Sequence, residues 1–164
     1  MKPQSAPKLL YRGSRDGFTP QAFHSKCDGK AKTVTIIQTD SSYVFGGYTA
    51  SPWKSDYSYG NDPTAFIFSL RRNGEQNNQK FKVNDSRTAI YNAPYYGPVF
   101  GSNEGNSYSD IVVSLNPYSN NHADFGSSYN TGSMTPRSEE AKNYLAGKST
   151  LWNVIEIEVY QIDG

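Results

Sequence analysis

Cysteine and histidine are scarce in this chain of 164 residues, and their scarcity removes several classes of site. The one cysteine, Cys27, cannot form a disulfide within the chain, so neither a disulfide scaffold nor a cysteine-type zinc site is expected. We interpret Cys27 as a packed core residue, since buried thiols are common. The two histidines, His24 and His122, belong to no metal-binding His-x-x-x-His pair and no recognisable nucleophile motif.

An enzyme is therefore not expected. Glu156 and Glu158 lie on the same side of a predicted strand and could imitate the carboxylate pair of a glycosidase. We expect them instead to face solvent or to pair with Arg and Lys. The chain also has no glycine-rich loop of the kind that holds phosphate groups.

An excess of charge of one sign is absent as well, because 16 Lys and Arg balance 15 Asp and Glu. A surface for nucleic acid or an anionic membrane needs surplus basic residues, so neither partner is expected. No segment approaches the roughly 18 apolar residues of a membrane span. Residues 1–7 lack the apolar core of an export signal, although a secreted protein whose signal had been replaced would look the same.

Leucine and alanine are few, whereas tyrosine (13) and glycine (14) are abundant, together with Ser and Asn. Long helices favour the reverse composition. Tyr, Ser, Gly and Asn supply rigid amphipathic rings and adaptable hydrogen bonds, which suit polar recognition surfaces. The same composition is also typical of loop-rich β proteins.

Two segments predict short helices. Thr19 can cap a helix whose first position is Pro20 and which ends by residues 28–29. Residues 138–147 place acids in the first turn of a second helix and Gly147 at its end. The predicted strands are 9–12, 33–38, 43–49, 65–70, 79–83, 88–91, 111–115 and 151–162.

Alternation within the strands predicts which side chains share a face. Phe66, Phe68 and Leu70 lie on one face of their strand. In the last strand the residues expected on one face are Leu151, Ile155, Ile157 and Val159. The pair Gly46-Gly47 indicates a bulge or the close approach of another backbone.

Many short strands with Gly, Pro and Asn between them predict a mainly β fold. We expect a two-sheet antiparallel β-sandwich with one or two short flanking helices. Residues 1–8 are interpreted as an N-terminal arm, and residues 9–164 as a single domain.

Residues 103–110, Asn-Glu-Gly-Asn-Ser-Tyr-Ser-Asp, form an oxygen-rich loop before an apolar strand. Hard cations such as calcium bind about six to eight oxygen ligands, so one loop rarely suffices, and the spacing is not that of an EF-hand. A second polar loop, residues 50–63, would have to lie beside it. The candidate calcium ligands are Asn103, Glu104, Asn106, Asp110, Asn61 and Asp62. The plainer alternative is a polar surface loop.

If the two loops meet at one end of the sandwich, they form a concave patch with aromatic residues on its rim. The candidate sugar-binding residues are Trp53, Tyr57, Tyr59, Tyr108 and Asp56. A calcium ion can accept two adjacent sugar hydroxyls, carboxylates can bond the same hydroxyls, and a ring can cover the apolar face of the sugar. This combination predicts calcium-dependent sugar binding.

The order of several motifs resembles the TLDc domain family over roughly residues 9–162. The matching segments are Leu-Tyr-Arg-Gly-Ser-Arg-Asp-Gly-Phe (10–18), Phe-Gly-Gly-Tyr-Thr (45–49), Ala-Phe-Ile-Phe-Ser-Leu (65–70), Gly-Pro-Val-Phe-Gly (97–101), Phe-Gly-Ser-Ser-Tyr (125–129) and Ile-Glu-Ile-Glu-Val-Tyr (155–160). The resemblance implies a β-sandwich with flanking helices and no generally accepted catalytic residues. Its best-known members are intracellular oxidation-resistance proteins, some of which bind the vacuolar proton pump.

The chain departs from that family pattern at one loop. In the family, the Asp that opens the next strand follows Phe-Gly almost at once, whereas here residues 102–109 intervene before Asp110. Because this enlargement is oxygen-rich, we expect a calcium-dependent lectin for terminal galactose-type sugars, secreted or extracellular, and similar in build to single-domain invertebrate lectins. A homodimer would give such a protein avidity.

Two alternatives stay open. One is a cytoplasmic TLDc interaction module of the oxidation-resistance type that associates with the proton pump. The other is a structural domain of a larger protein.

Overall fold

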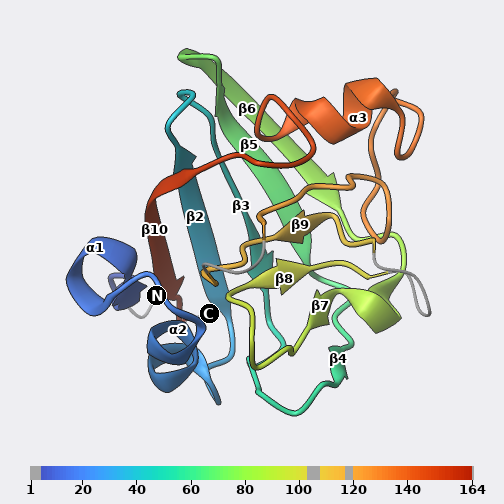
Figure 1. Cartoon of the computed structure of the whole chain (residues 1–164). Helices are drawn as coiled ribbons and strands as arrows, with labels where there is room; N and C mark the ends of the chain where they lie inside the picture. Colours follow the sequence, from blue (N-terminus) through green and yellow to red (C-terminus); the bar gives the residue numbers. More distant parts are fainter. Residues whose placement is uncertain (1–4, 103–107, 117–119, 164) are drawn as a thin grey trace.

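Two antiparallel sheets face each other in the computed structural model, which describes residues 5–102, 108–116 and 120–163 (Figure 1). The six-stranded sheet has the order β1 (Lys8–Arg12), β10 (Val154–Gln161), β2 (Thr33–Thr39), β3 (Val44–Thr49), β5 (Phe66–Arg72) and β6 (Glu75–Lys82). The four-stranded sheet has the order β4 (Tyr59–Gly60), β7 (Ile90–Tyr91), β8 (Val99–Phe100) and β9 (Ile111–Val112). The predicted two-sheet mainly β fold is confirmed.

Short helices flank the sheets. They are α1 (Gly13–Asp16), α2 (Pro20–Cys27), α3 (Glu139–Tyr144) and the 3-10 turn η1 (Ser86–Thr88). The caps explain where two of them begin: Thr19 accepts a hydrogen bond from Ala22 N, and Ser138 accepts one from Ala141 N. No helix among the described residues is long and apolar enough to cross a membrane.

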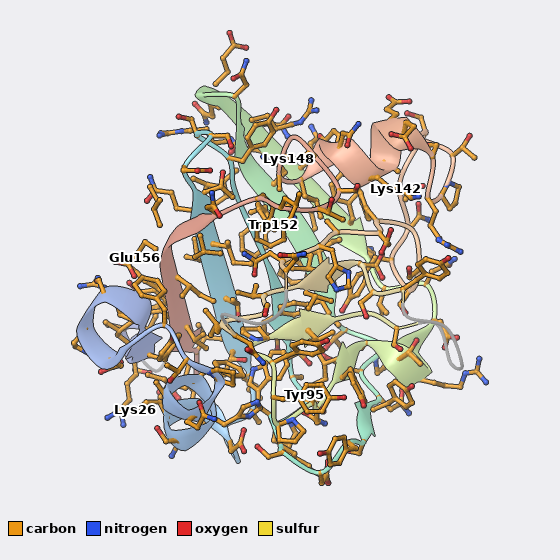
Figure 2. All side chains as sticks on the ribbon, viewed as in Figure 1. Lys26, Tyr95, Lys142, Lys148, Trp152 and Glu156 are labelled. Carbon is orange, nitrogen blue, oxygen red and sulfur yellow. The ribbon has the colours of Figure 1, made fainter. Side chains whose placement is uncertain are left out.

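The core lies between the two sheets and is rich in aromatic side chains. Phe45 contacts Trp152 edge to face, with ring centroids 5.3 Å apart, and Trp152 lies inside the molecule in Figure 2. The other large side chains that are fully buried include Tyr11, Phe23, Trp53, Phe100, Phe125, Ile37, Ile67, Ile90, Ile111 and Leu145. These rings hold the small sheet against the large one.

The two glycines of β3 allow close approach on both sides of the strand, as predicted. A Cβ at Gly46 would lie 1.8 Å from the carbonyl oxygen of Thr35 on the neighbouring strand. A Cβ at Gly47 would lie 2.5 Å from the ring of Phe100 in the facing sheet. Side chains at these positions would force the sheets or the strands apart.

The last strand differs from its predicted alternation. It begins at Val154 and has a register shift between Val154 and Glu156. Ile157 and Val159 are buried as expected, but Leu151 lies outside the strand and Ile155 is half exposed. The irregularity puts an extra residue into the strand, so the period of two breaks there. At the other end of the chain, β1 starts at Lys8, which pairs with Gln161, one residue before the predicted boundary.

Candidate functional site

Four tyrosines gather where β4 pairs with β7, and we call them the tyrosine face: Tyr57, Tyr59, Tyr91 and Tyr95. Tyr59 pairs with Tyr91 across the two strands, with ring centroids 5.2 Å apart. The centroids of Tyr57 and Tyr95 are 5.8 Å apart. Figure 2 shows Tyr95 at the same end of the molecule as the loop that leads into β4. Two segments distant in sequence thus form one aromatic surface.

The rings of this face are open to solvent. Tyr57 is 58% exposed, Tyr95 44% and Tyr59 40%. Tyr91 is half-buried among them, and burial together with the Tyr95 hydroxyl raises the pKa of Tyr91 to about 12. The Tyr91 hydroxyl is therefore neutral at physiological pH and can act as a hydrogen-bond donor or acceptor.

Asp56 adds a carboxylate beside these rings. Its side chain accepts hydrogen bonds from the hydroxyl and the backbone N–H of Ser58, which lower the Asp56 pKa below its ordinary value. The residue is exposed and ionised at neutral pH. Rings, neutral hydroxyls and one carboxylate are therefore available to a ligand on this surface.

Asn92 fixes the turn that carries Tyr57 onto β7. The residue is 1% exposed, and its side-chain oxygen accepts a hydrogen bond from Lys54 N at 2.9 Å. Its backbone exchanges two further bonds with this turn, from Tyr57 N to Asn92 O and from Asn92 N to Ser58 O, each 2.9 Å. The tyrosine face is consequently attached to a sheet strand instead of a free loop.

His24 holds the segment that carries Tyr95. Its Nε2 lies 2.8 Å from the carbonyl oxygen of Tyr96 and 3.0 Å from that of Ala93, and its Nδ1 lies 2.7 Å from Asp28 Oδ1. These contacts tie the first turn after β7 to the end of α2. The histidine is 9% exposed and has a structural part in the site.

Replacement of Asn92 by alanine should lower the free energy of unfolding by about 1–3 kcal/mol, because the Lys54 N–H loses its acceptor. Urea denaturation measures this loss, and Asn61→Ala, at an exposed position of the same loop, is the matched control. Equal stability of the two variants would contradict the anchoring role of Asn92.

Trp53 was predicted on the rim of the site, and this prediction is wrong. The side chain is fully buried, and its Nε1 donates a hydrogen bond to Thr33 Oγ1 at 2.9 Å. The ring contacts Phe23 and Phe100 edge to face, at 5.4 and 5.5 Å between centroids. Trp53 therefore belongs to the core and attaches the 50–63 loop to it.

Asp62, a predicted calcium ligand, organises the base of the same loop. Its Oδ1 accepts from the backbone N–H and the hydroxyl of Thr64, at 2.8 and 2.6 Å. Its Oδ2 accepts from Ala50 N at 2.6 Å and from Thr49 Oγ1 at 3.1 Å. Burial opposes ionisation, but these hydrogen bonds outweigh it and lower the Asp62 pKa. The carboxylate is 3% exposed and already has four donors.

Asp110, another predicted calcium ligand, is completely buried and clamps a turn. Burial raises its pKa to about 7, while the backbone N–H donors of that turn favour the ionised form. The donors are Gly126 N at 2.8 Å, Ser127 N at 3.1 Å, Ser128 N at 2.6 Å and Tyr129 N at 3.4 Å.

The same turn also holds the residue on the other side of the oxygen-rich loop. Ser128 Oγ accepts a hydrogen bond from Ser102 N and donates one to Ser102 O, both at 3.0 Å. Gly101, with φ of +78°, leaves room for the buried carboxylate, since a Cβ there would lie 2.0 Å from Asp110 Oδ2. Both flanks of the loop are thus fixed to one turn.

Asp62 and Asp110 do not fit as calcium ligands, because every one of their oxygens already accepts protein hydrogen bonds and neither faces solvent. Asn61 is exposed. The remaining predicted ligands, Asn103, Glu104 and Asn106, lie outside the described residues. Among the residues that are described, no three His, Cys, Asp or Glu side chains gather as a metal site.

The predicted sugar-binding set is divided by the fold. Asp56, Tyr57 and Tyr59 lie on the tyrosine face, whereas Tyr108 is 38% exposed and stacks against another partner, with the Arg137 guanidinium carbon 3.7 Å from its ring centroid. Sequence reasoning missed Tyr91 and Tyr95, although three tyrosines within residues 91–96 were a signal. It also missed Asn92, for which no local signal exists.

A comparison with models of known protein families identifies one that covers this chain. The family model of the TLDc domain matches residues 2–163, nearly the whole chain. A comparison with curated proteins found no match.

Proposed function

Since the chain belongs to the TLDc domain family, we propose that it is a non-enzymatic binding module of that family whose tyrosine face binds carbohydrate. The observation that carries this proposal is two contacting pairs of tyrosine rings, Tyr57 with Tyr95 and Tyr59 with Tyr91, of which three rings are exposed, together with the exposed carboxylate of Asp56. A ring can cover the apolar face of a sugar, while Tyr hydroxyls and Asp56 bond its hydroxyl groups.

Terminal galactose-type sugars are the first candidates, because the arrangement of their C–H groups gives one ring face that is largely apolar. Adjacent hydroxyls of such a sugar can reach Asp56 while that face lies on a tyrosine ring. A secreted or extracellular location accords with this ligand class.

The first test is retention on a galactose-bearing resin, with a glucose-bearing resin as the comparison. We expect Tyr57→Ala and Tyr95→Ala each to weaken sugar affinity at least about tenfold, since exposed aromatic anchors dominate binding sites. Phe18→Ala is the matched control, because Phe18 is 41% exposed and its ring lies against Gly13, away from the tyrosine face. If wild-type protein is retained on neither resin nor on a wider panel of immobilised glycans, carbohydrate binding is wrong.

Calcium dependence stays a separate prediction that rests on Asn61 and on ligands outside the described residues. Thermal melts with calcium and then with chelator measure it, because a ligand that binds only the folded state raises the melting temperature. Asn61→Ala should reduce any calcium-induced shift. If calcium leaves the melting temperature unchanged, the calcium prediction is wrong. Carbohydrate binding by the tyrosine face is tested separately by the resin experiment.

Family membership favours a second candidate, a cytoplasmic interaction module that associates with the vacuolar proton pump. The tyrosine face suits this function too, since Tyr is enriched at the energetic centres of protein interfaces. Co-sedimentation of the purified chain with detergent-solubilised proton pump distinguishes the two candidates. Pump binding that Tyr95→Ala abolishes, without retention on any glycan, would favour the interaction module.

A further inference from the structure

The face of the six-stranded sheet that points away from the small sheet is apolar, and we call it the outer face. The four-stranded sheet and α3 lie on the opposite side (Figure 1). Along β2 and β5, Ile37 and Ile67 point inward and are fully buried, whereas the alternate positions point outward. The apolar residues of the outer face are Val34, Ile36, Val44, Tyr48, Phe66, Phe68 and Leu70.

These side chains border two adjoining hollows in the outer face. One hollow is lined by Val34, Ile36, Phe66, Phe68 and Leu70 together with polar residues of β6. The other also includes Ile36 and Leu70 and extends toward Glu156 and Glu158 of β10. Leu70 is 40% exposed. A continuous apolar patch of this kind marks an interaction surface in a soluble protein.

The helices leave the middle of this sheet uncovered. Helices α1 and α2 pack against β1 and β10, at one edge of the sheet. Strands β2, β3 and β5, which carry the apolar residues, are the inner strands. The apolar patch therefore lies at the centre of the face with the helices to one side.

Charges of opposite sign flank the apolar centre. Strand pairing places Glu158, Ile36, Gly46, Phe68 and Lys80 in one row across five strands. Between β10 and β6 the row runs from a carboxylate to an ammonium, and beyond Glu158 it continues to Arg12 of β1.

Neighbouring residues reinforce both signs. At the acidic end Glu156 lies beside Glu158, which pairs with Arg12 at 3.0 Å. At the basic end Lys82 adjoins Lys80, whose ammonium lies 4.0 Å from the ring centroid of Phe66. At the β10 edge itself two carboxylates face the guanidinium of Arg12, and the Arg71 guanidinium of β5 lines the same hollow nearer the middle of the sheet.

From this pattern we propose that the outer face binds a second copy of this chain, in a dimer whose two-fold axis runs parallel to the strands above β3. Such an axis reverses the order of strands between the facing sheets, so Glu158 of each copy lies over Lys80 of the other and Ile36 lies over Phe68. A two-fold axis in the plane of the sheet but perpendicular to the strands would instead place Glu158 of one copy over Glu158 of the other. Gly46, at the middle of the row, is covered by the ring of Phe68, whose Cζ would lie 3.0 Å from a Cβ at this position.

The sheet geometry sets the size of the interface. Five strands at about 4.8 Å spacing and about seven residues at 3.3 Å rise give a patch of roughly 20 by 23 Å. Its flat outline of about 460 Å² per partner is below the roughly 800 Å² per partner of standard complexes and corresponds to a small, weakly associating interface. Facing sheets pack at about 10 Å with aligned strands, as the proposed axis requires. The dimer is independent of the carbohydrate proposal, although it would give two tyrosine faces and hence avidity.

Sedimentation velocity tests the dimer. Wild-type protein should sediment as a dimer, and Leu70→Lys should raise the dissociation constant at least about tenfold because it places a charge within the apolar part of the interface. Leu151→Lys is the matched control, since Leu151 is 60% exposed and lines neither hollow. Thermal melts confirm that each variant is folded. A monomeric wild type, or a Leu70→Lys variant that dimerises as the wild type does, would overturn the proposal.

A charge exchange tests the position of the two-fold axis. Glu158→Lys alone and Lys80→Glu alone should each sediment as monomers, because like charges then face each other twice. Mixing the two variants should restore the dimer, since both contacts again join opposite charges. Glu158→Lys also removes the partner of Arg12, so the Lys80→Glu variant is the independent test. If Lys80→Glu dimerises as strongly as the wild type, the proposed geometry is wrong. It is also wrong if both variants are folded and their mixture forms no dimer.

Discussion

Replacing Asp110 with asparagine should lower the free energy of unfolding by about 3 kcal/mol. The carboxylate accepts four backbone N–H groups from residues 126–129 in a fully buried place. Asparagine has nearly the same shape, but its NH₂ group would face N–H donors, which leaves buried donors without an acceptor. Urea denaturation at fixed pH measures the difference.

The matched control for this substitution is Asp56→Asn, at an exposed aspartate whose donors both come from Ser58. We expect that change to cost under about 1 kcal/mol, because water can replace the lost bond. Chelator should not reproduce the Asp110→Asn effect in wild-type protein. If chelation destabilised the wild type as much as the substitution does, Asp110 would be a metal ligand after all and the clamp would be the wrong explanation.

Truncation of Trp53 to alanine should cost about 3–5 kcal/mol of folding free energy, the range for deleting a large buried aromatic side chain. The ring fills the space between Phe23 and Phe100, and its N–H satisfies Thr33. Loss of the ring leaves a cavity where the 50–63 loop, α2 and β8 meet. Thermal and urea denaturation give the change in stability.

Tyr57→Ala, at an exposed aromatic position of the same loop, should leave stability within about 0.5 kcal/mol, because substitutions at exposed sites rarely cost more. The pair of variants separates a core residue from a surface residue. If the Trp53→Ala protein were as stable as the wild type and had lost only ligand binding, Trp53 would be a binding residue on the rim and not a core residue.

Local sequence signals were sufficient for most elements. Thr19 with Pro20, and Ser138 with the acids after it, begin helices because their side chains satisfy backbone N–H groups of the first turn, an interaction that needs no distant partner. β-Branched and aromatic residues bounded by turn residues located β2, β3 and β5, and alternation within β5 gave the side chains that share one face. The paired glycines of β3 correctly indicated a close approach.

The candidate site was predictable only in part. Tyr57 and Tyr59 occur in a polar loop, and their exposure follows from that composition. Tyr91 and Tyr95 lie beside them because β4 pairs with β7. No local sequence pattern predicts this contact between two distant segments. Asn92 has its role for the same reason, since it follows β7 and its partners precede β4, so the pairing of these strands brings them together.

The sequence alone determines the type and the approximate position of the helices and strands, because propensity, capping and alternation act over a few residues. Only the tertiary structure determines whether a given polar or apolar side chain faces the core or the solvent. Phe66, Phe68 and Leu70 alternate in the same way whether their face meets the core or solvent, and the packing of the small sheet on the other side puts them on the outer face, where Leu70 is 40% exposed and Phe68 9%. A carboxylate such as Asp110 is equally suited to a metal or to backbone N–H groups, and the approach of residues 126–129 decides between them because burial makes those four donors its partners.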